Sequence, residues 1–277
     1  MLPPLKHLTF AGQDWEYLIK GSGKMGMLVF PGGGQYAQSQ YKTAEAFSNK
    51  YKVIIPTIYG IYSIKDCCDG VNKILDDEKV DKVVVYGLSI GALLAQSYTK
   101  RNLGKVQALI ISHGSTPTSL TYKRKIIQPL QLLNLALPVI PSALVKLIAK
   151  KWAGRIQGIS RYVTQDFNER TAQDILTRKQ LAKNFYQNYL NKKLVKTWIS
   201  LHFDFYQDRF DKKTFKDWRG RVLILRTDND PLMQDDGEFK KIYPKAVVKT
   251  FSGTGHLTDI YRQNEVIKSI GDFLLKW

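Results

Sequence analysis

The stretch VVVYGLSIGALLAQSY (residues 83–98) places a serine between two glycines, where an aliphatic run meets a second apolar run. The first run, residues 83–86, is apolar without alternation, which is typical of a strand buried on both faces of a parallel sheet. The second run, residues 90–101, has the length and composition of a helix. The sequence therefore predicts a tight strand-to-helix turn with Ser89 at its centre.

The residues around this serine match the pattern G-x-S-x-G, with Gly87 and Gly91 as the two glycines. Such a turn holds its serine in a strained backbone conformation above the edge of the sheet. The N-terminus of the following helix directs amide N–H groups toward the same point. A serine hydroxyl is a poor nucleophile at neutral pH and needs a base. We interpret Ser89 as a candidate nucleophile.

Strand and helix patterns alternate on both sides of this turn. We expect strands at residues 15–19, 27–30, 53–55, 83–86, 106–112, 222–226 and 247–251. We expect helices at residues 37–49, 64–75, 90–101, 235–242 and 264–275. Right-handed crossovers between such strands give an α/β fold with a doubly wound, mostly parallel sheet.

The glycines of GSGKMG (residues 21–26) match the dinucleotide-binding pattern G-x-G-x-x-G. That pattern requires a helix after it, whereas the following residues, 27–30, have the composition of a strand. We interpret residues 21–26 as a hairpin turn that joins the strands at residues 15–19 and 27–30.

The alternation of strands and helices stops after residue 114. Helices are predicted within the next segment at residues 126–137, 143–152, 172–190 and 192–206. The sequence therefore predicts a core domain, residues 1–114 and 217–277, that is interrupted by a helical cap, residues 115–216. The uncharged run at residues 126–145 has the length of a membrane span, but three prolines and several polar side chains within it argue against one.

Composition narrows the class of protein. The chain has 277 residues, is 44% hydrophobic and carries a formal net charge of +18. Residues 115–220 hold 20 Lys and Arg against 7 Asp and Glu, so the basicity belongs mainly to the predicted cap. No nucleic-acid-binding pattern and no metal-ligand spacing accompany it, and we expect no nucleic-acid partner, metal or cofactor. Adjacent cysteines, Cys67 and Cys68, and an N-terminus without a secretory pattern predict a cytoplasmic protein.

A base and an acid for Ser89 are expected after later strands. His256 directly follows the strand at residues 247–251, within a loop that contains two glycines. The strand at residues 222–226 leads into Asp228 and Asp230. Partners of such a serine follow in the order serine, acid, histidine. We favour Asp230 as the acid, with Asp228 as the alternative.

An oxyanion formed at Ser89 needs backbone N–H donors. The residue after the nucleophile, Ile90, is expected to provide one of them. The glycine run after Phe30 lets the backbone approach a substrate closely, and we expect the second donor from Gly33, with Gly34 as the alternative.

Four motifs together resemble the α/β-hydrolase superfamily. They are FPGGG, GLSIG, TDNDPL and GTGH, and they stand in the superfamily's order across residues 15–112 and 221–277. The resemblance implies an α/β-hydrolase fold with a helical cap and a Ser–His–Asp triad. One residue departs from the pattern, because many relatives have a histidine where this chain has Pro31. Serine at position 89 argues against the relatives that attack with an aspartate.

The expected activity is hydrolysis of a carboxylic ester or thioester through an acyl-enzyme. Two alternatives are kept: hydrolysis of an amide, peptide or C–C bond on the same fold, and a non-catalytic protein that binds a ligand or an anionic surface. Apolar and aromatic residues of the predicted cap suggest a small-molecule substrate with an apolar acyl group. The aromatic residues are Phe185, Tyr186, Tyr189, Trp198, Phe203, Phe205 and Tyr206.

Basic residues flank the apolar run of the predicted cap. Lys123, Arg124 and Lys125 precede this run, and Lys150 and Lys151 follow it. This arrangement resembles an interfacial anchor, which would associate weakly with an anionic membrane surface. A solvated basic surface that keeps the protein soluble explains the same residues and is the favoured interpretation.

Overall fold

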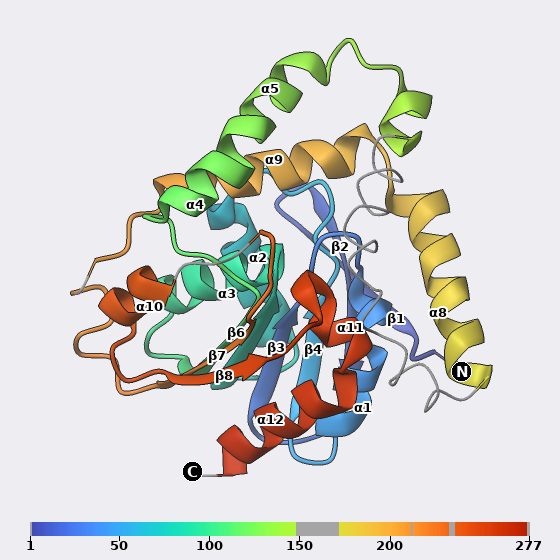
Figure 1. Ribbon diagram of the computed structural model, residues 1–277. Helices are drawn as coiled ribbons and strands as arrows, with labels where there is room; N and C mark the ends of the chain where they lie inside the picture. The colour runs from blue at the N-terminus through green and yellow to red at the C-terminus, as the bar shows by residue number, and fades with distance from the viewer. Residues whose placement is uncertain (1, 148–171, 212, 233–235, 276–277) are drawn as a thin grey trace.

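The computed structural model describes residues 2–147, 172–211, 213–232 and 236–275. An eight-stranded sheet forms its centre, with the strand order β1-β2-β4-β3-β5-β6-β7-β8. The strands are β1 (Leu5–Phe10), β2 (Gln13–Lys20), β3 (Gly26–Phe30), β4 (Lys52–Pro56), β5 (Val83–Leu88), β6 (Val106–Ser112), β7 (Arg221–Thr227) and β8 (Val247–Phe251). Only the pairs β1–β2 and β2–β4 are antiparallel. The mostly parallel sheet with helices on both faces confirms the predicted α/β fold class (Figure 1).

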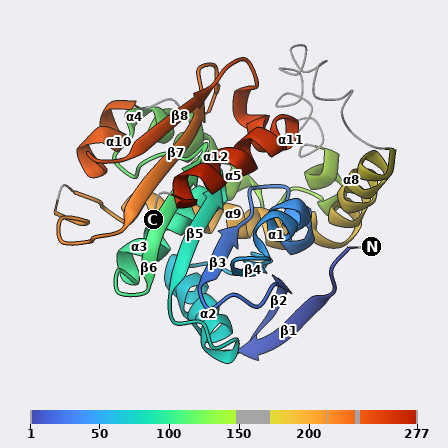
Figure 2. The same cartoon turned by 90° about the horizontal axis from the view of Figure 1, so that it is seen from below.

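Helices cover both faces of the sheet, as the views in Figures 1 and 2 show. One face packs against α2 (Ile64–Asp77), α3 (Ile90–Arg101) and α9 (Lys192–Gln207). The other face packs against α1 (Tyr41–Phe47) and α12 (Gln263–Leu275). The sheet is therefore buried on both sides, which explains why its central strands are apolar without alternation.

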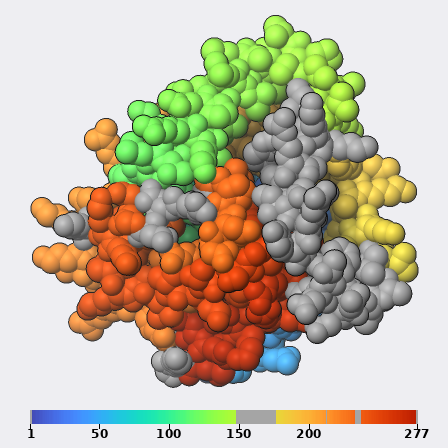
Figure 3. Space-filling model, in the orientation of Figure 1, coloured from blue at the N-terminus to red at the C-terminus, as the bar shows by residue number. Residues whose placement is uncertain are grey.

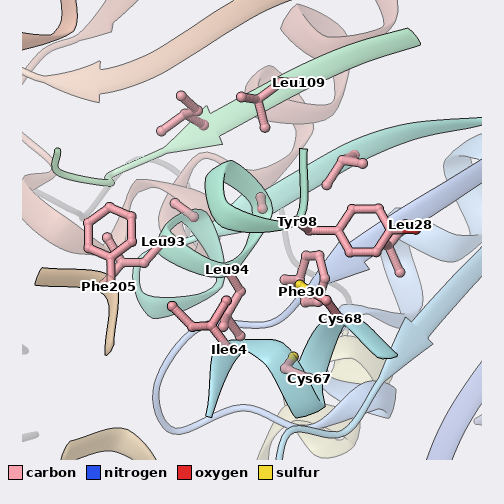
Figure 4. Close-up of a cluster of buried hydrophobic side chains, with 14 of the residues drawn as sticks. Leu28, Phe30, Ile64, Cys67, Cys68, Leu93, Leu94, Tyr98, Leu109 and Phe205 are labelled. Carbon is pink, nitrogen blue, oxygen red and sulfur yellow. The ribbon is translucent and has the colours of Figure 1, made fainter. Parts of the chain in front are cut away.

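The central strand β5 shows how this burial works. Val83 and Val85 belong to the core beside α2 and α3, whereas Val84 and Tyr86 belong to the core beside α1 and α12. Successive side chains of a strand point to opposite faces, so an uninterrupted apolar run supplies both cores. Figure 4 shows the first of these cores, in which Cys67 and Cys68 of α2 lie among aromatic and aliphatic side chains.

The predicted hairpin around residues 21–26 is wrong. Strand β2 pairs with β1 and β4, and β4 lies between β2 and β3. Glycine at position 21 instead allows two stretches of backbone to pass close to each other. A Cβ atom on Gly21, whose φ is +88°, would lie 2.3 Å from the backbone oxygens of Ser48 and Tyr51. The connection from β2 to β3 therefore passes directly against the turn that precedes β4.

Two further details differ from the sequence-based expectation. Strand β1, at the edge of the sheet, was not expected. The helix expected at residues 37–49 is a 3₁₀ turn, η1 (Ala37–Gln40), followed by the shorter helix α1. The helix expected at residues 235–242 is α10 (Asp236–Ile242), and residue 235 lies outside the described residues.

In the segment between β6 and β7, all the regular secondary structure that the structure describes is helical, and turns join the helices. Its named elements are α4 (Leu120–Tyr122), the π-helical η2 (Lys123–Ile127), α5 (Gln128–Ala136), α8 (Ala172–Asn184), the π-helical η4 (Phe185–Tyr189) and α9. Residues 142–147 are also helical, while residues 148–152 of the helix predicted there lie outside the described residues, as do Lys150 and Lys151. The division into a core and a cap at residues 115–216 stays a prediction, and residues 148–171 and 212 of that cap are not described.

Aromatic side chains join this helical segment to the rest of the molecule. The ring of Tyr189 stacks on Tyr36, which follows β3, with 4.8 Å between the ring centroids. The side-chain amide of Asn184 donates a hydrogen bond of 2.8 Å to the Tyr36 hydroxyl. All seven aromatic residues singled out in the sequence belong to packed clusters, so their main observed role is packing. Within the described residues, no helix has both the length and the apolar character needed to span a bilayer.

The turn from β5 into α3 is crowded by the end of β3. Strands β3 and β5 are parallel neighbours, with Phe30 opposite Gly87. A Cβ atom on Gly87 would lie 2.2 Å from the backbone oxygen of Gly91, and one on Gly91 would lie 2.1 Å from that of Phe30. Contacts this short with backbone atoms are prohibitive, so both positions require glycine.

We expect the substitution Gly91→Ala to lower the free energy of unfolding by about 3 kcal/mol or more, because backbone atoms must move to admit the methyl group. Chemical denaturation measures the change. Gly271→Ala is the matched control, since a Cβ atom on this glycine of α12 meets nothing within 4 Å. Its effect should stay within about 1 kcal/mol, in the stabilising direction. Equal stability of the Gly91→Ala variant and the unsubstituted protein would contradict the close approach described above.

Candidate active site

Ser89 occupies the turn between β5 and α3 with φ 54° and ψ −117°. A non-glycine residue in this region of backbone space costs roughly 1–3 kcal/mol and persists only when its surroundings enforce it. Here the Ser89 N–H donates a 2.9 Å hydrogen bond to the Ser112 carbonyl oxygen, and the Ala92 N–H donates one of 2.9 Å to the Ser89 carbonyl oxygen. The turn is thus tied to β6 on one side and to α3 on the other.

His256 lies beside this serine. It belongs to the short 3₁₀ turn η5 (Gly255–Leu257), which follows β8. Its Nε2 atom is 2.8 Å from Ser89 Oγ, and its Nδ1 atom is 2.9 Å from Asp230 Oδ2. Three residues that are far apart in the sequence therefore form one chain of hydrogen bonds.

The hydrogen bonds indicate the tautomer of His256. An ionised carboxylate only accepts hydrogen bonds, so Nδ1 carries a proton and donates it to Asp230. In the neutral ring, Nε2 then carries the lone pair and accepts a hydrogen bond from the Ser89 hydroxyl. This is the arrangement in which an imidazole can remove a proton from a serine.

Asp230 is fully buried in the loop after β7, and His256 is only 7% exposed. Burial alone raises the pKa of the Asp230 carboxyl. The hydrogen bond and charge of His256, the charge of His113 and the Leu232 N–H outweigh burial, and the net pKa lies below its ordinary value. Asp230 is therefore ionised at neutral pH, as a carboxylate that orients an imidazolium must be.

The other aspartate of this loop faces elsewhere. Asp228 is exposed, and its Oδ1 atom accepts a 3.0 Å hydrogen bond from the Gly253 N–H. Between the two aspartates, Asn229 Oδ1 accepts a 2.9 Å hydrogen bond from the Gly255 N–H. Three successive side chains thus bind the loop that carries His256, and only Asp230 contacts the imidazole.

The expected oxyanion donors lie around the same turn. Ile90 is the first residue of α3, so its N–H has no acceptor within the helix. Gly33 lies in a turn after β3 that is closed by a 3.2 Å hydrogen bond from the Gln35 N–H to the Gly32 carbonyl oxygen. This turn packs on Leu88, because a Cβ atom on Gly32 would lie 3.3 Å from the Leu88 backbone oxygen. The donor roles of Ile90 and Gly33, or of Gly34, stay predictions.

A second buried polar cluster, which the sequence analysis missed, adjoins His256. Asp259, in α11 (Thr258–Tyr261), accepts hydrogen bonds from the hydroxyls of Tyr86 and Ser112, the latter at 2.8 Å. His113 Nδ1 lies 3.2 Å from the same carboxylate. The His113 ring in turn packs edge-on against the His256 ring, with centroids 5.8 Å apart.

This cluster fixes the position of the turn that carries His256. Tyr86 belongs to β5, Ser112 ends β6 and Asp259 lies three residues after His256. A sequence signal for it existed, because the carboxyl ends of parallel strands meet at one edge of a sheet and Ser112-His113 stand at such an end. Burial raises the pKa of Asp259, but the hydrogen bonds and charge of His113, together with the bonds from Tyr86 and Ser112, bring it below its ordinary value.

We expect Asp259→Asn to lower the free energy of unfolding at neutral pH by about 3 kcal/mol. The substitution removes the buried negative charge that accepts hydrogen bonds from three donors. The lowered pKa means that the carboxylate's contribution is fully present above its unfolded pKa of about 4 and is lost as the pH falls through the lower folded pKa. The difference from the unsubstituted protein should therefore shrink in acid. Urea denaturation across pH measures it.

Asp272→Asn provides the control for this experiment. Asp272 is exposed on α12, where its carboxylate pairs with Lys268. Loss of such a surface pair should change stability by less than about 1 kcal/mol at any pH. If Asp259→Asn behaved like this control, the cluster would not anchor the turn.

Among the residues that the structure describes, no group of three His, Cys, Asp or Glu side chains is arranged to hold a metal ion. The candidate site brings together the Ser89 hydroxyl, the His256 imidazole and the Asp230 carboxylate. A hydroxyl placed against the lone pair of a neutral, carboxylate-oriented imidazole can attack an electrophilic carbon.

Comparison with known proteins identifies the family to which the chain belongs. The family model described as alpha/beta hydrolase fold matches residues 27–261. No curated protein sequence matches the chain. Among solved structures, the chain resembles the enol-lactonase from Burkholderia xenovorans LB400, with TM-score 0.70 and 16% identity over 98% of this chain and 100% of that one.

Two further structures have the same architecture. One comes from a study of carboxylesterases of the ammonia-oxidizing thaumarchaeon Nitrososphaera gargenis, with TM-score 0.70 and 18% identity over 98% of both chains. The other is a thermophilic esterase from Thermogutta terrifontis, with TM-score 0.67 and 13% identity over 99% of this chain and 98% of that one. At such identities the likeness establishes the fold, and the family match covers most of the sequence. The chain belongs to the α/β-hydrolase fold family and is a hydrolase.

Proposed function

We propose that this hydrolase cleaves a carboxylic ester or thioester through an acyl-enzyme, with Ser89 as nucleophile, His256 as general base and acid, and Asp230 as the orienting carboxylate. The observation that carries the proposal is the hydrogen-bond chain from Ser89 Oγ through His256 to Asp230, at 2.8 and 2.9 Å. The strained turn at the N-terminus of α3 supports it independently.

The chemistry follows from these positions. As Ser89 Oγ attacks the substrate carbonyl, His256 Nε2 takes the hydroxyl proton, and Asp230 stabilises the resulting imidazolium. His256 then gives the proton to the leaving alcohol or thiol. In the second half, a water molecule loses a proton to His256 and attacks the acyl-enzyme, and Ser89 regains its hydroxyl proton as the acid leaves.

Charge develops on the carbonyl oxygen during both attacks. The N–H groups of Ile90 and Gly33 are the donors that we assign to it, in keeping with the helix N-terminus and the glycine turn beside Ser89. A donor of this kind is worth about a hundredfold to a thousandfold in rate. We infer that the substrate is a small molecule with an apolar acyl group, accommodated against the apolar side chains of the segment between β6 and β7.

An ester or thioester is favoured over an amide by what the fold's neighbours are described to be. They include an enol-lactonase, whose substrate class is a cyclic ester, and esterases. An enzyme that binds a free amino terminus should also hold carboxylates near its substrate. The predicted cap region is poor in them, because residues 115–220 hold 7 Asp and Glu against 20 Lys and Arg.

A fluorophosphonate probe tests the nucleophile. We expect it to label the protein at Ser89, and Ser89→Ala to abolish both labelling and turnover, because the Ser89 hydroxyl is hydrogen-bonded to the imidazole. Ser22→Ala, which changes an exposed serine in the connection after β2, should label normally. Labelling that persists in the Ser89→Ala variant would refute the assignment.

A substrate panel tests the bond that is cleaved. Aryl esters and acyl-coenzyme A should be hydrolysed, whereas aminoacyl amides should not. Turnover of amides alone would support the peptidase alternative, and an unlabelled protein that binds ligand without turnover would support the non-catalytic one.

The pair Asp230→Asn and Asp228→Asn tests which carboxylate orients His256. We expect Asp230→Asn to lower kcat by about a thousandfold or more, because an amide can stabilise the wrong imidazole tautomer and cannot neutralise the imidazolium. Asp228→Asn should leave kcat nearly unchanged, since an amide oxygen still accepts the Gly253 N–H. Steady-state kinetics on the best ester of the panel measures both, and equal losses in the two variants would contradict the proposed acid.

A further inference from the structure

We propose that the protein docks on anionic lipid surfaces through an apolar ridge on the outside of α5 and its neighbouring turns. We call this surface the outer ridge. Its centre consists of Leu132, Leu135 and Val139, which are 72%, 77% and 81% exposed. Leu120, before this centre in the chain, and Leu144 and Leu147, after it, are also exposed.

The outer ridge is not the side of α5 that packs on the protein. Leu133 and Leu137 point the other way and contact a cluster that includes Val195 and Ile199 of α9. Residues 132, 135 and 139 are separated by three and four positions, so they share one side of the helix and its continuing turn. A helix that is apolar on both sides needs a partner for each side, and among the described residues only the inner side has one.

The shape of this surface fits an interface with lipid. Helix α5 stands at the top of the molecule in Figure 1, and Figure 3 shows it as a projecting ridge on that face. A peptide or a helix of a protein partner would favour a groove with apolar walls. A projecting apolar ridge can instead insert between lipid headgroups.

The basic residues near α5 indicate which kind of lipid surface the outer ridge would bind. Lys123, Arg124 and Lys125 are exposed on η2, directly before α5, and Lys146 is exposed among the leucines at the far end. The stretch of sequence that carries these residues contains no carboxylate between Asp81 and Asp166. Basic residues beside exposed apolar side chains favour a negatively charged surface. A second copy of this chain is disfavoured as the partner, because each copy has a net charge of +18.

Vesicle flotation tests this proposal without reference to catalysis. We expect the protein to float with vesicles of phosphatidylglycerol and phosphatidylcholine but not with vesicles of phosphatidylcholine alone, and high salt to reduce the bound fraction. The triple variant Leu132→Gln, Leu135→Gln, Val139→Gln should bind the anionic vesicles about tenfold less strongly. Lys123→Gln with Arg124→Gln should also weaken binding, and this loss should disappear at high salt.

Matched controls separate docking from general effects. The triple variant Leu176→Gln, Val247→Gln, Val248→Gln changes three exposed apolar side chains on α8 and β8 and should float normally. Lys213→Gln with Lys216→Gln controls for loss of charge. Ser89→Ala should also float normally, so that failure of the proposed catalytic assignment is distinct from failure of docking. Circular dichroism and probe labelling of Ser89 report whether the ridge variants remain folded.

Three results would overturn the proposal. The first is an unsubstituted protein that does not float with anionic vesicles, and the second is a folded ridge variant that floats as well as the unsubstituted protein. The third is a dimer in analytical ultracentrifugation that the ridge variant abolishes without a change in flotation, which would assign the ridge to a second copy of the chain.

Discussion

The arrangement of this molecule depends on a steric constraint at the turn between β5 and α3. The backbone can reverse there only because Gly87 and Gly91 leave room for the carbonyl groups of the turn itself and of β3. The reversal leaves Ser89 with a positive φ, and its hydroxyl emerges where α3 begins. Because β3, β5, β6, β7 and β8 run parallel, the loops that follow them meet at this same edge of the sheet.

Local features of the sequence were sufficient to predict the serine turn, most strands and the fold class. These features follow from short sequence patterns, whose conformation depends mainly on residues that are neighbours in the chain. Strand order is different, because it depends on contacts between distant segments. The apolar pattern of residues 15–19 and 27–30 fits a hairpin as well as it fits the observed sheet, in which β4 separates β2 from β3. Strand β1 was not predicted because Lys6, His7 and Thr9 interrupt its apolar pattern. Such polar residues are tolerated there because β1 lies at an edge of the sheet.

The sequence favoured Asp230 over Asp228 as the partner of His256, but the local pattern left Asp228 open as the alternative. Asp228 and Asp230 occupy the same loop, and the backbone path that separates their roles is set by bonds to residues about 25 positions later in the chain. The Asp259 cluster was missed for the same reason, because its members come from β5, β6 and α11. Two buried carboxylates thus act on one histidine: Asp230 contacts its ring, and Asp259 holds the turn on which it stands. Such double support keeps a side chain close to its working geometry.

The loops after β7 and β8 are joined residue by residue, through Asp228 with Gly253, Asn229 with Gly255 and Asp230 with His256. This correspondence makes the length of each loop as significant as its composition. Inserting or deleting one residue within either loop would shift the register and present an amide or a solvent-facing carboxylate to the imidazole. Loops grafted from a relative should therefore be exchanged as a pair, and length variation in this family should concentrate in connections that carry no such matched bonds.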